Sequence, residues 1–218
     1  MFKVFIAILQ KDLRENFLSN KAWFSISFFM LSLLIFPLSF GKGNLEEQNI
    51  IIPAIWIAAL FSNLIALEQM YKDDFKDGTL LYYSINGISM SIIVVAKCIS
   101  HWLFCGLPIA IIAPICSYIF SGESNNFYLF LTLFLGTAIL TLIGSPISAI
   151  MLGISARGPM LTFITLPFYL PTIIFGVMGS NVTNNNINAE IYLLLAILSL
   201  GIVIFPILTI KILRTVIN

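Results

Sequence analysis

The sequence predicts an all-α integral membrane protein, with six membrane-spanning helices and an N-terminal helix in the membrane interface. The first observation is composition: 59% of the 218 residues are apolar and only 10% are charged. A soluble domain is roughly 45–50% apolar and about 25% charged, so this chain has too few polar side chains to cover a surface in water. The second is a series of uncharged runs of about 20 residues, the length at which a helix crosses a bilayer core of roughly 30 Å. The third is the placement of lysines and arginines on alternate connections.

The uncharged runs place six spans in order along one transmembrane domain, residues 1–218. We expect the spans at about residues 22–40, 48–67, 98–120, 127–150, 159–179 and 190–210. One further uncharged run, Gly78–Ala96, is rich in serine, tyrosine and other polar residues, and we interpret it as an interfacial segment rather than a seventh span. No small-residue cleavage site follows the first span at Phe40, so we expect that span to remain in the mature protein.

Residues 1–21 form a separate element before the first span. Their apolar residues recur at steps of three and four, which places one apolar stripe on a helix; the stripe is Phe2, Phe5, Ile6, Leu9, Leu13 and Phe17. Most charged residues of the segment lie off this stripe. We therefore expect a helix that lies in the cytoplasmic interface, with a helix packed on a soluble partner as the alternative.

The distribution of positive charge predicts the orientation of the chain. Every lysine and arginine except Lys42 lies in the N-terminal segment, in the connection between the second and third spans, in that between the fourth and fifth, or in the C-terminal tail. Positively charged loops stay on the cytoplasmic side. We therefore expect both termini to be cytoplasmic.

Prolines and glycines occur in most of the predicted spans. The nine prolines lie inside or at the edge of the apolar runs, and each interior one frees a carbonyl and can kink its helix. We expect a jointed bundle of the kind found in proteins that change shape, with packing without motion as the alternative. Six glycines allow close approach of helices: Gly106, Gly136, Gly144, Gly153, Gly176 and Gly201.

The stretch directly after the second span concentrates charge. It holds Glu68, Lys72, Asp73, Asp74, Lys76 and Asp77. Apolar residues between positions 67 and 75 form another side of the same helix, and Gly78 terminates it. A short charged helix fixed to a span offers a contact surface to a soluble partner, because movement of that partner moves the span. We predict a cytoplasmic coupling segment, residues 68–97, with a solvated loop as the alternative.

The same stretch resembles part of one enzyme signature. Asp74-x-x-Asp77-Gly78 matches the opening of the membrane CDP-alcohol phosphotransferase signature, but Val95 and Ile99 stand where that signature has two more aspartates. Without those carboxylates the metal ions lack oxygen ligands. We therefore do not expect this activity.

Other chemistries are excluded by residue types. The run Gly41-Lys42-Gly43 lacks the first glycine and the Ser or Thr of a phosphate-binding loop. The chain has a single histidine, which lies in the third predicted span, so we expect no Ser/His/Asp or Cys/His catalytic set; a net charge of +1 gives no basic field for nucleic acid. We predict that the protein is not an enzyme and that any ATP hydrolysis takes place in a separate subunit.

The third span carries a face of soft ligands. Cys98, His101 and Cys105 share this face, and Cys116 extends it. Such side chains can hold haem iron or a metal, but one helix cannot place two axial ligands on opposite sides of a haem. His101 also lies only about 6 Å along the helix from Lys97, and a polar contact between helices is the alternative. We keep His101 and Lys97 as candidates for a polar or haem pathway, and we predict no metal site, zinc site or disulfide framework.

The residues from Pro53 to Glu68, followed by those from Asp73 to Leu80, resemble the CcmB family, haem exporter protein B of the cytochrome c maturation system. Shorter stretches add to the resemblance at residues 36–41, 96–102, 106–108, 135–137, 144–146 and 166–171. It covers roughly residues 1–180 and implies the membrane subunit of a type-2 ABC exporter with six helices.

The resemblance also implies partners and a ligand. It implies a separate ABC ATPase (cytochrome c maturation protein A), the haem-handling subunits C and D, and the haem chaperone E. The ATPase contact would fall on Glu68, Asp73, Asp74, Asp77 and Gly78. Haem would be the transported or handled ligand rather than a bound cofactor, in a bacterial or mitochondrial inner membrane. The alternatives are a type-2 ABC permease for a lipid, polysaccharide or drug, and a haem-holding membrane cytochrome.

Overall fold

Long apolar runs can satisfy their backbone groups inside a membrane only as helices or closed barrels, and every described element of this chain is helical. The computed structural model describes residues 2–18, 20–40, 48–121, 127–153, 157–180 and 189–217. The helices are α1 (Phe2–Leu18), α2 (Asn20–Phe40), α3 (Gln48–Leu67), α4 (Lys72–Lys76), α5 (Thr79–Ile85), α6 (Met90–His101), α7 (Leu107–Ser121), α8 (Phe127–Ile150), α9 (Arg157–Ser180) and α10 (Ala189–Ile217). A π-helical turn, η2 (Trp102–Gly106), joins α6 to α7, and a 3-10 turn, η3 (Met151–Gly153), ends α8.

Five helical runs of the described chain are long and apolar enough to cross a membrane, and the bent pair of α1 and α2 gives a sixth when taken together. The five are Ile50–Lys76, Met90–Ile119, Phe127–Gly153, Met160–Ser180 and Ala189–Ile217. The prediction of an all-α integral membrane domain is therefore confirmed. Lys42, the one positive charge predicted to lie away from the cytoplasmic side, is outside the described residues.

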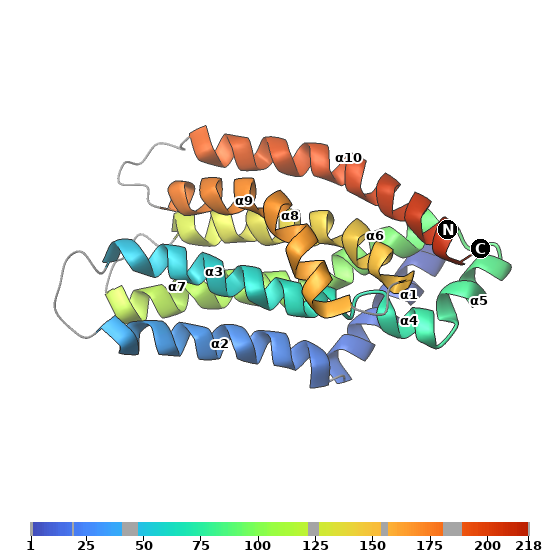
Figure 1. Cartoon of the computed structure of the whole chain (residues 1–218), viewed down its shortest axis with the longest axis horizontal. Coiled ribbons are helices and arrows are strands. Elements are labelled where there is room, and N and C mark those ends of the chain that lie inside the picture. The colour runs from blue at the N-terminus through green and yellow to red at the C-terminus, as the bar shows by residue number, and fades with distance from the viewer. Residues whose placement is uncertain are drawn as a thin grey trace.

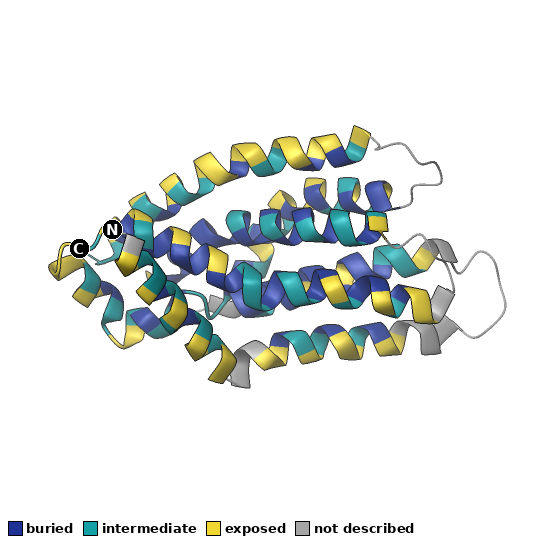
Figure 2. Ribbon diagram, turned by 180° about the vertical axis from the view of Figure 1, so that it is seen from behind, coloured by how far each residue is buried: buried dark blue, intermediate teal, exposed yellow. Residues whose placement is uncertain are grey.

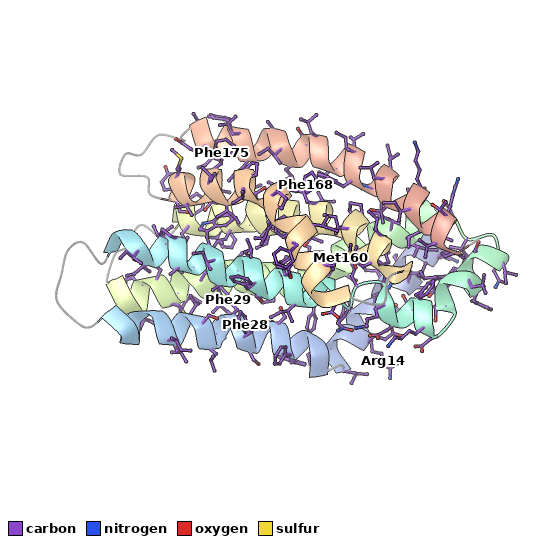
Figure 3. The ribbon with its side chains drawn as sticks, viewed as in Figure 1. Arg14, Phe28, Phe29, Met160, Phe168 and Phe175 are labelled. Carbon is purple, nitrogen blue, oxygen red and sulfur yellow. The ribbon has the colours of Figure 1, made fainter. Side chains whose placement is uncertain are left out.

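α8 lies at the centre of the bundle and packs against α3, α7, α9 and α10 (Figure 1). Most of its residues are buried, whereas α10 turns many apolar side chains outward, as Figure 2 shows along the uppermost helix. α1 begins and α10 ends at the end of the molecule that also carries α4 and α5. Figure 3 places Arg14 of α1 toward that end, and the labelled phenylalanines of α2 and α9 along the bundle.

Trp56 of α3 fills a space that two glycines leave open. A Cβ atom on Gly136 of α8 or on Gly176 of α9 would lie 2.2 Å from the indole ring of Trp56. Trp56 is fully buried, and its Nε1 donates to the hydroxyl of Ser180 over 3.3 Å. The prediction of close approach is confirmed at these two glycines, because only their lack of a side chain admits the ring between α8 and α9.

The other four glycines of the predicted set differ in how much space a side chain would have. A Cβ atom on Gly144 would lie 2.2 Å from Leu67, and one on Gly106 would lie 2.6 Å from Trp102. A Cβ on Gly201 would meet its nearest neighbour at 3.4 Å, and one on Gly153 would meet nothing within 4 Å. The prediction of close approach is therefore wrong for Gly153, which lies exposed in the turn after α8.

The irregular turn η2 interrupts the helix of the third predicted span. Pro108 has no N–H to donate to the carbonyl of Phe104, which lies inside this turn. Trp102 at its start donates from Nε1 to the hydroxyl of Thr137 on α8 over 3.2 Å. The helices that hold Pro146, Pro167 and Pro171 run without such an interruption, although Figure 1 shows α9 bent along its length.

The uncharged run between residues 78 and 96 divides into two structural parts. Its first part forms α5, and its last part forms the start of α6, which begins at Met90 and continues into the third predicted span. Ile93, Val94 and Ala96 are fully buried, so packing against α1, α8 and α10 extends this helix beyond the run that charge alone marks out. The position at which the membrane surface crosses α6 stays a prediction.

Helix α1 packs on α6 through a face that differs from the predicted stripe. Among residues 3–18, whose burial the structure describes, Ile8 and Asp12 are the buried ones at 4% exposure each, while stripe residues such as Ile6, Leu9 and Leu13 are half-buried. The reason is electrostatic: Asp12 turns inward to meet a buried lysine of α6.

Candidate functional site

The charged stretch after α3 forms the short helix α4, and the start of the uncharged run forms α5, at the end of the molecule that holds the beginning of α1 (Figure 1). α4 keeps helical hydrogen bonding as far as Asp77, whose N–H donates to the carbonyl of Asp73 over 2.9 Å. Gly78 then adopts a left-handed conformation, with φ of +72°, and α5 follows. A side chain there would meet no atom within 4 Å, so the backbone conformation, and not lack of space, requires glycine.

Four charged residues from three helices form a buried network, called here the four-charge cluster: Lys11 and Asp12 of α1, Asp74 of α4 and Lys97 of α6. Nζ of Lys11 lies 2.8 Å from Oδ1 of Asp74, and Lys97 pairs with the other carboxylate oxygen of Asp74. Nζ of Lys97 also lies 3.5 Å from Oδ1 of Asp12. Asp12, Asp74 and Lys97 are only 4% to 6% exposed. Each buried charge therefore has a neighbour of opposite sign.

Mutual attraction within the cluster opposes the cost of burying charge, and it outweighs that cost at Lys11 but not at Asp12. Burial alone would lower the pKa of Lys11, but its hydrogen bond to Asp74 and the charge of Asp74 raise that pKa above its ordinary value. Burial raises the pKa of the Asp12 carboxyl, while the charge of Lys97 acts to lower it. Removing one partner from a buried ion pair typically costs about 3–5 kcal/mol. The cluster thus ties α1, α4 and α6 to one another.

Tyr71 connects the cluster to the core of the bundle. Its side chain is fully buried, and the ammonium of Lys97 lies 5.9 Å from the centre of its ring, within the range of a cation–π contact. The Tyr71 hydroxyl lies 2.8 Å from that of Ser145 on α8. Ser145 in turn is 3.2 Å from the hydroxyl of Thr209 on α10 and accepts from Cys98 over 3.5 Å. A chain of polar contacts therefore runs from the cluster to α8 and α10.

His101 makes a polar contact between helices. Its Nδ1 lies 3.3 Å from the hydroxyl oxygen of Thr141 on α8. The Thr141 hydroxyl donates to the carbonyl of Thr137 over 3.0 Å. Because a hydroxyl has one proton to donate, Nδ1 of His101 carries the ring proton and donates to Thr141. Nε2 then has an unshared electron pair, and it has no hydrogen-bond partner among the described residues.

A cleft of about 90 Å³ lies beside the four-charge cluster, between α1, the end of α3, α4 and α6. It is lined by Asp12, Glu15, Asn16, Ala66, Gln69, Met70, Asp73, Asp74, Lys97, Ser100, His101 and Cys105. Pockets for drug-sized ligands have roughly 300–1,000 Å³, so a porphyrin does not fit inside this cleft. In the described part of the chain, no three His, Cys, Asp or Glu side chains are placed to hold a metal ion.

The structure separates the predicted coupling residues. Asp74 faces inward and belongs to the cluster, while Asp73 lies half-buried on the wall of the cleft. Glu68 accepts from Lys72 one turn later over 3.0 Å. Asp77 is exposed beside Gly78, at the joint between α4 and α5. The predicted pair Lys97 and His101 is brought together with Asp73 and Asp74 on one cleft.

Three exposed apolar residues of α5 belong to the same end of the molecule, and sequence reasoning missed them. Leu81, Tyr82 and Ile85 are 49%, 64% and 76% exposed, whereas Leu80 is 1% exposed. The α5 sequence mixes leucine and isoleucine with threonine, tyrosine and serine over only seven residues, so no periodicity separates the inward from the outward face. Gly78 and Gly87, both with positive φ, flank the helix, and their spacing was the available signal for a short separate helix.

The fold and the position of these residues define a helical membrane domain with a small projecting segment at the end that bears the beginning of α1. The CcmB protein family matches residues 3–215, and the chain therefore belongs to this family. It is 33% identical over 178 residues to heme exporter protein B of Haemophilus influenzae, with 79% of each chain covered. It is 30% identical to heme exporter protein B of Pseudomonas aeruginosa, over 81% of this chain and 80% of that protein. To the Escherichia coli K12 protein of the same name it is 30% identical, with 87% of each chain covered.

Proposed function

We propose that this chain is the membrane subunit of an ABC transporter that exports haem, and that α4 and α5 form its contact with a separate ATPase subunit. The names of its relatives support the haem-export part. The sequence contains no phosphate-binding loop, which supports the placement of nucleotide hydrolysis in another chain. The same system supplies the further proposed partners, haem-handling subunits C and D and haem chaperone E.

One observation carries the proposed contact site: α4 and α5 present charged and apolar side chains together at the end of the bundle. Lys76 and Asp77 are exposed at the end of α4, next to Leu81, Tyr82 and Ile85 on α5. Aromatic and apolar anchors with charged residues around them are typical of protein interfaces. We place this end, with both termini, on the cytoplasmic or matrix side of an inner membrane.

The four-charge cluster gives this contact a mechanical consequence. α4 follows α3 through continuous turns, since the N–H of Glu68 donates to Leu64 and that of Met70 donates to Leu67. Asp74 of α4 pairs with Lys11 of α1 and with Lys97 of α6. A displacement of α4 by an ATPase would therefore act on α1, α3 and α6 at once. In the proposed cycle, this displacement accompanies release of the haem-loaded chaperone.

The experiment tests the contact with a double variant, Asp77→Lys with Ile85→Asp. Asp74 is left unchanged because its loss would break the four-charge cluster. The tagged chain is expressed with the ATPase of its own system, and the ATPase that co-purifies is measured. We expect the double variant to lose most of the bound ATPase and the cell to lose c-type cytochromes.

The matched control is Arg214→Glu, a charge reversal at an exposed position near the end of α10. It should retain the ATPase. Retention of the ATPase by the double variant would contradict the contact site. A deletion strain with normal c-type cytochromes would contradict the haem-export function and favour another cargo.

A further inference from the structure

Besides Asp74, whose Oδ2 pairs with Lys97, three residues that line the cleft each have a buried acceptor atom without a hydrogen-bond partner among the described residues. The three atoms are Oδ2 of Asp12, Oε1 of Gln69 and Nε2 of His101. Asp12 and His101 are only 4% and 5% exposed. Buried polar atoms in native proteins are nearly always satisfied. Three unpartnered acceptors on one cleft therefore point to a ligand that donates hydrogen bonds.

The position of the ring proton on His101 makes its Nε2 a hydrogen-bond acceptor, like the oxygens of Asp12 and Gln69. Its Nδ1 donates to Thr141, because the Thr141 proton is directed at the carbonyl of Thr137. The neutral ring consequently presents Nε2 as an acceptor. A ligand with acceptors of its own, such as a phosphate oxygen, would find no donor at this atom.

The charge around the cleft favours a cation. Four acids lie on its wall, Asp12, Glu15, Asp73 and Asp74, against Lys97 on the wall and Lys11 behind it. Both lysines are already engaged in the four-charge cluster, and Lys11 also pairs with Glu15 over 3.3 Å. A primary ammonium has one positive charge, three N–H donors and no acceptor. It matches three acceptors with an excess of negative charge, and it fits within about 90 Å³.

The residues that follow the cleft-lining part of α1 are exposed and apolar, as expected of a surface that contacts lipid. Glu15 and Asn16 line it, and the next residues, Phe17 and Leu18, are 62% and 69% exposed. Trp23 packs edge-on against Phe17 and donates from Nε1 to its carbonyl over 2.9 Å. Exposed tryptophan at the end of an apolar helix is typical of the headgroup level of a bilayer. The cleft thus lies next to an apolar surface that acyl chains can cover.

We propose that this cleft binds the primary ammonium of an ethanolamine phospholipid headgroup. Asp12, Gln69 and His101 accept from its three N–H groups, and the acyl chains lie against Phe17 and Leu18. Free ethanolamine offers the same ammonium, and the experiment distinguishes the two sources. This inference does not depend on the ATPase contact proposed above.

The test measures the melting temperature of the full-length chain in phosphatidylglycerol nanodiscs that also contain either phosphatidylethanolamine or phosphatidylcholine. The two added lipids differ at the headgroup nitrogen. In ethanolamine this nitrogen has three N–H donors, whereas in choline three methyl groups replace them and no donor is left. We expect the melting temperature with phosphatidylethanolamine to exceed that with phosphatidylcholine by about 2–4 °C. Gln69→Leu and His101→Phe should each remove most of this difference.

The matched control is Gln10→Leu, at an exposed position of α1 away from the cleft; it should keep the difference. Free ethanolamine added to discs with phosphatidylcholine reproduces the shift if the ammonium alone suffices, and leaves it absent if the acyl chains are needed. Equal melting temperatures of the wild type in the two lipids, or an undiminished difference in Gln69→Leu, would overturn the proposal. A lysine side chain of a protein partner would then be the remaining ammonium to consider.

Discussion

Asp74 shows how one carboxylate can organise three helices. It lies one residue after Asp73 and lines the same cleft, and it accepts from Lys11 of α1 and pairs with Lys97 of α6. A carboxylate offers two oxygens with about four lone-pair directions, so two ammonium groups can approach it from different sides. The position of Asp74 on α4 therefore lets Lys11 and Lys97 pair with the same carboxylate.

The first prediction concerns this carboxylate. Asp74→Ala should lower the free energy of unfolding by about 3–5 kcal/mol, because it removes the shared partner of the buried Lys97 and the half-buried Lys11. Asp77→Ala, at an exposed position of the same segment, should change it by no more than about 0.5 kcal/mol. Thermal unfolding in detergent compares the two variants. An equal loss in both would show that the cluster does not stabilise the fold.

The second prediction concerns the joint between α4 and α5. Gly78→Ala places a Cβ on a residue with φ of +72°, and a left-handed conformation costs a residue with a Cβ about 1–2 kcal/mol. The same change at Gly153, which also has open space around it, should cost less because its φ is not in the left-handed region. The measurement is the melting temperature of each variant. The explanation fails if Gly153→Ala proves as destabilising as Gly78→Ala.

The sequence was informative about which residues of the site gather together but not about their orientation. Composition marked residues 68–77 as the charged segment, and Lys97 and His101 as polar residues near it. The division between Asp73 and Asp74 depends on the positions of Lys11 and Lys97, which lie far away in the chain. Local pattern carries no information on such long-range pairing, and α5 offered no periodicity to show its exposed face.

At the scale of elements, Trp56 determines how closely α3, α8 and α9 approach. A third prediction follows from Gly176, where a Cβ would lie 2.2 Å from the indole ring. Gly176→Ala should lower stability by about 1–3 kcal/mol through overpacking. Gly201→Ala is the control, since its Cβ would lie 3.4 Å from the ring of Phe205. Melting temperatures in detergent provide the comparison.

A compensating change separates overpacking from other causes of that loss. In the double variant Gly176→Ala with Trp56→Leu, the smaller side chain leaves room for the added methyl group. The alanine should then cost less than it does beside tryptophan, which a double-mutant cycle measures. Additive losses would refute the packing explanation.

Helix limits were predictable where apolar runs end at charges or loops, and less so elsewhere. The run from residue 48 to 67 matches α3, since Glu68 follows directly. α6 starts at Met90 rather than near residue 98, because Ile93, Val94 and Ala96 pack inside the bundle. The π-helical turn at Trp102–Gly106 depends on Pro108 together with the contact between Trp102 and Thr137, and only the proline is visible in the local sequence.

At the scale of the whole molecule, the class of fold followed from composition and from the length of uncharged runs. The order of helices around α8 did not, because the spans are apolar on every side and their sequences do not show which faces meet. Polar contacts such as those of Ser145 with Tyr71 and Thr209 select neighbours in the bundle. These depend on pairs of residues from different spans.

A fourth prediction concerns the orientation of the molecule. α1 begins and α10 ends at one end of the bundle (Figure 1), and the positive charges of the sequence favour the cytoplasm for that end. Alkaline phosphatase, which is active only outside the cytoplasm, should be inactive when fused after Asn218. Inserted between residues 42 and 47, it should be active. The opposite pattern would reverse the orientation and remove the proposed ATPase contact.

The four-charge cluster also constrains the order in which the chain can be assembled during synthesis. Lys11 and Asp12 leave the ribosome first, Asp74 follows two helices later, and Lys97 comes last. Until the third long helix has been inserted, the leading amphipathic segment holds an aspartate whose buried counterion does not yet exist. The nascent protein must therefore keep this segment exposed to water. The segment can pack against the bundle only after roughly the first half of translation.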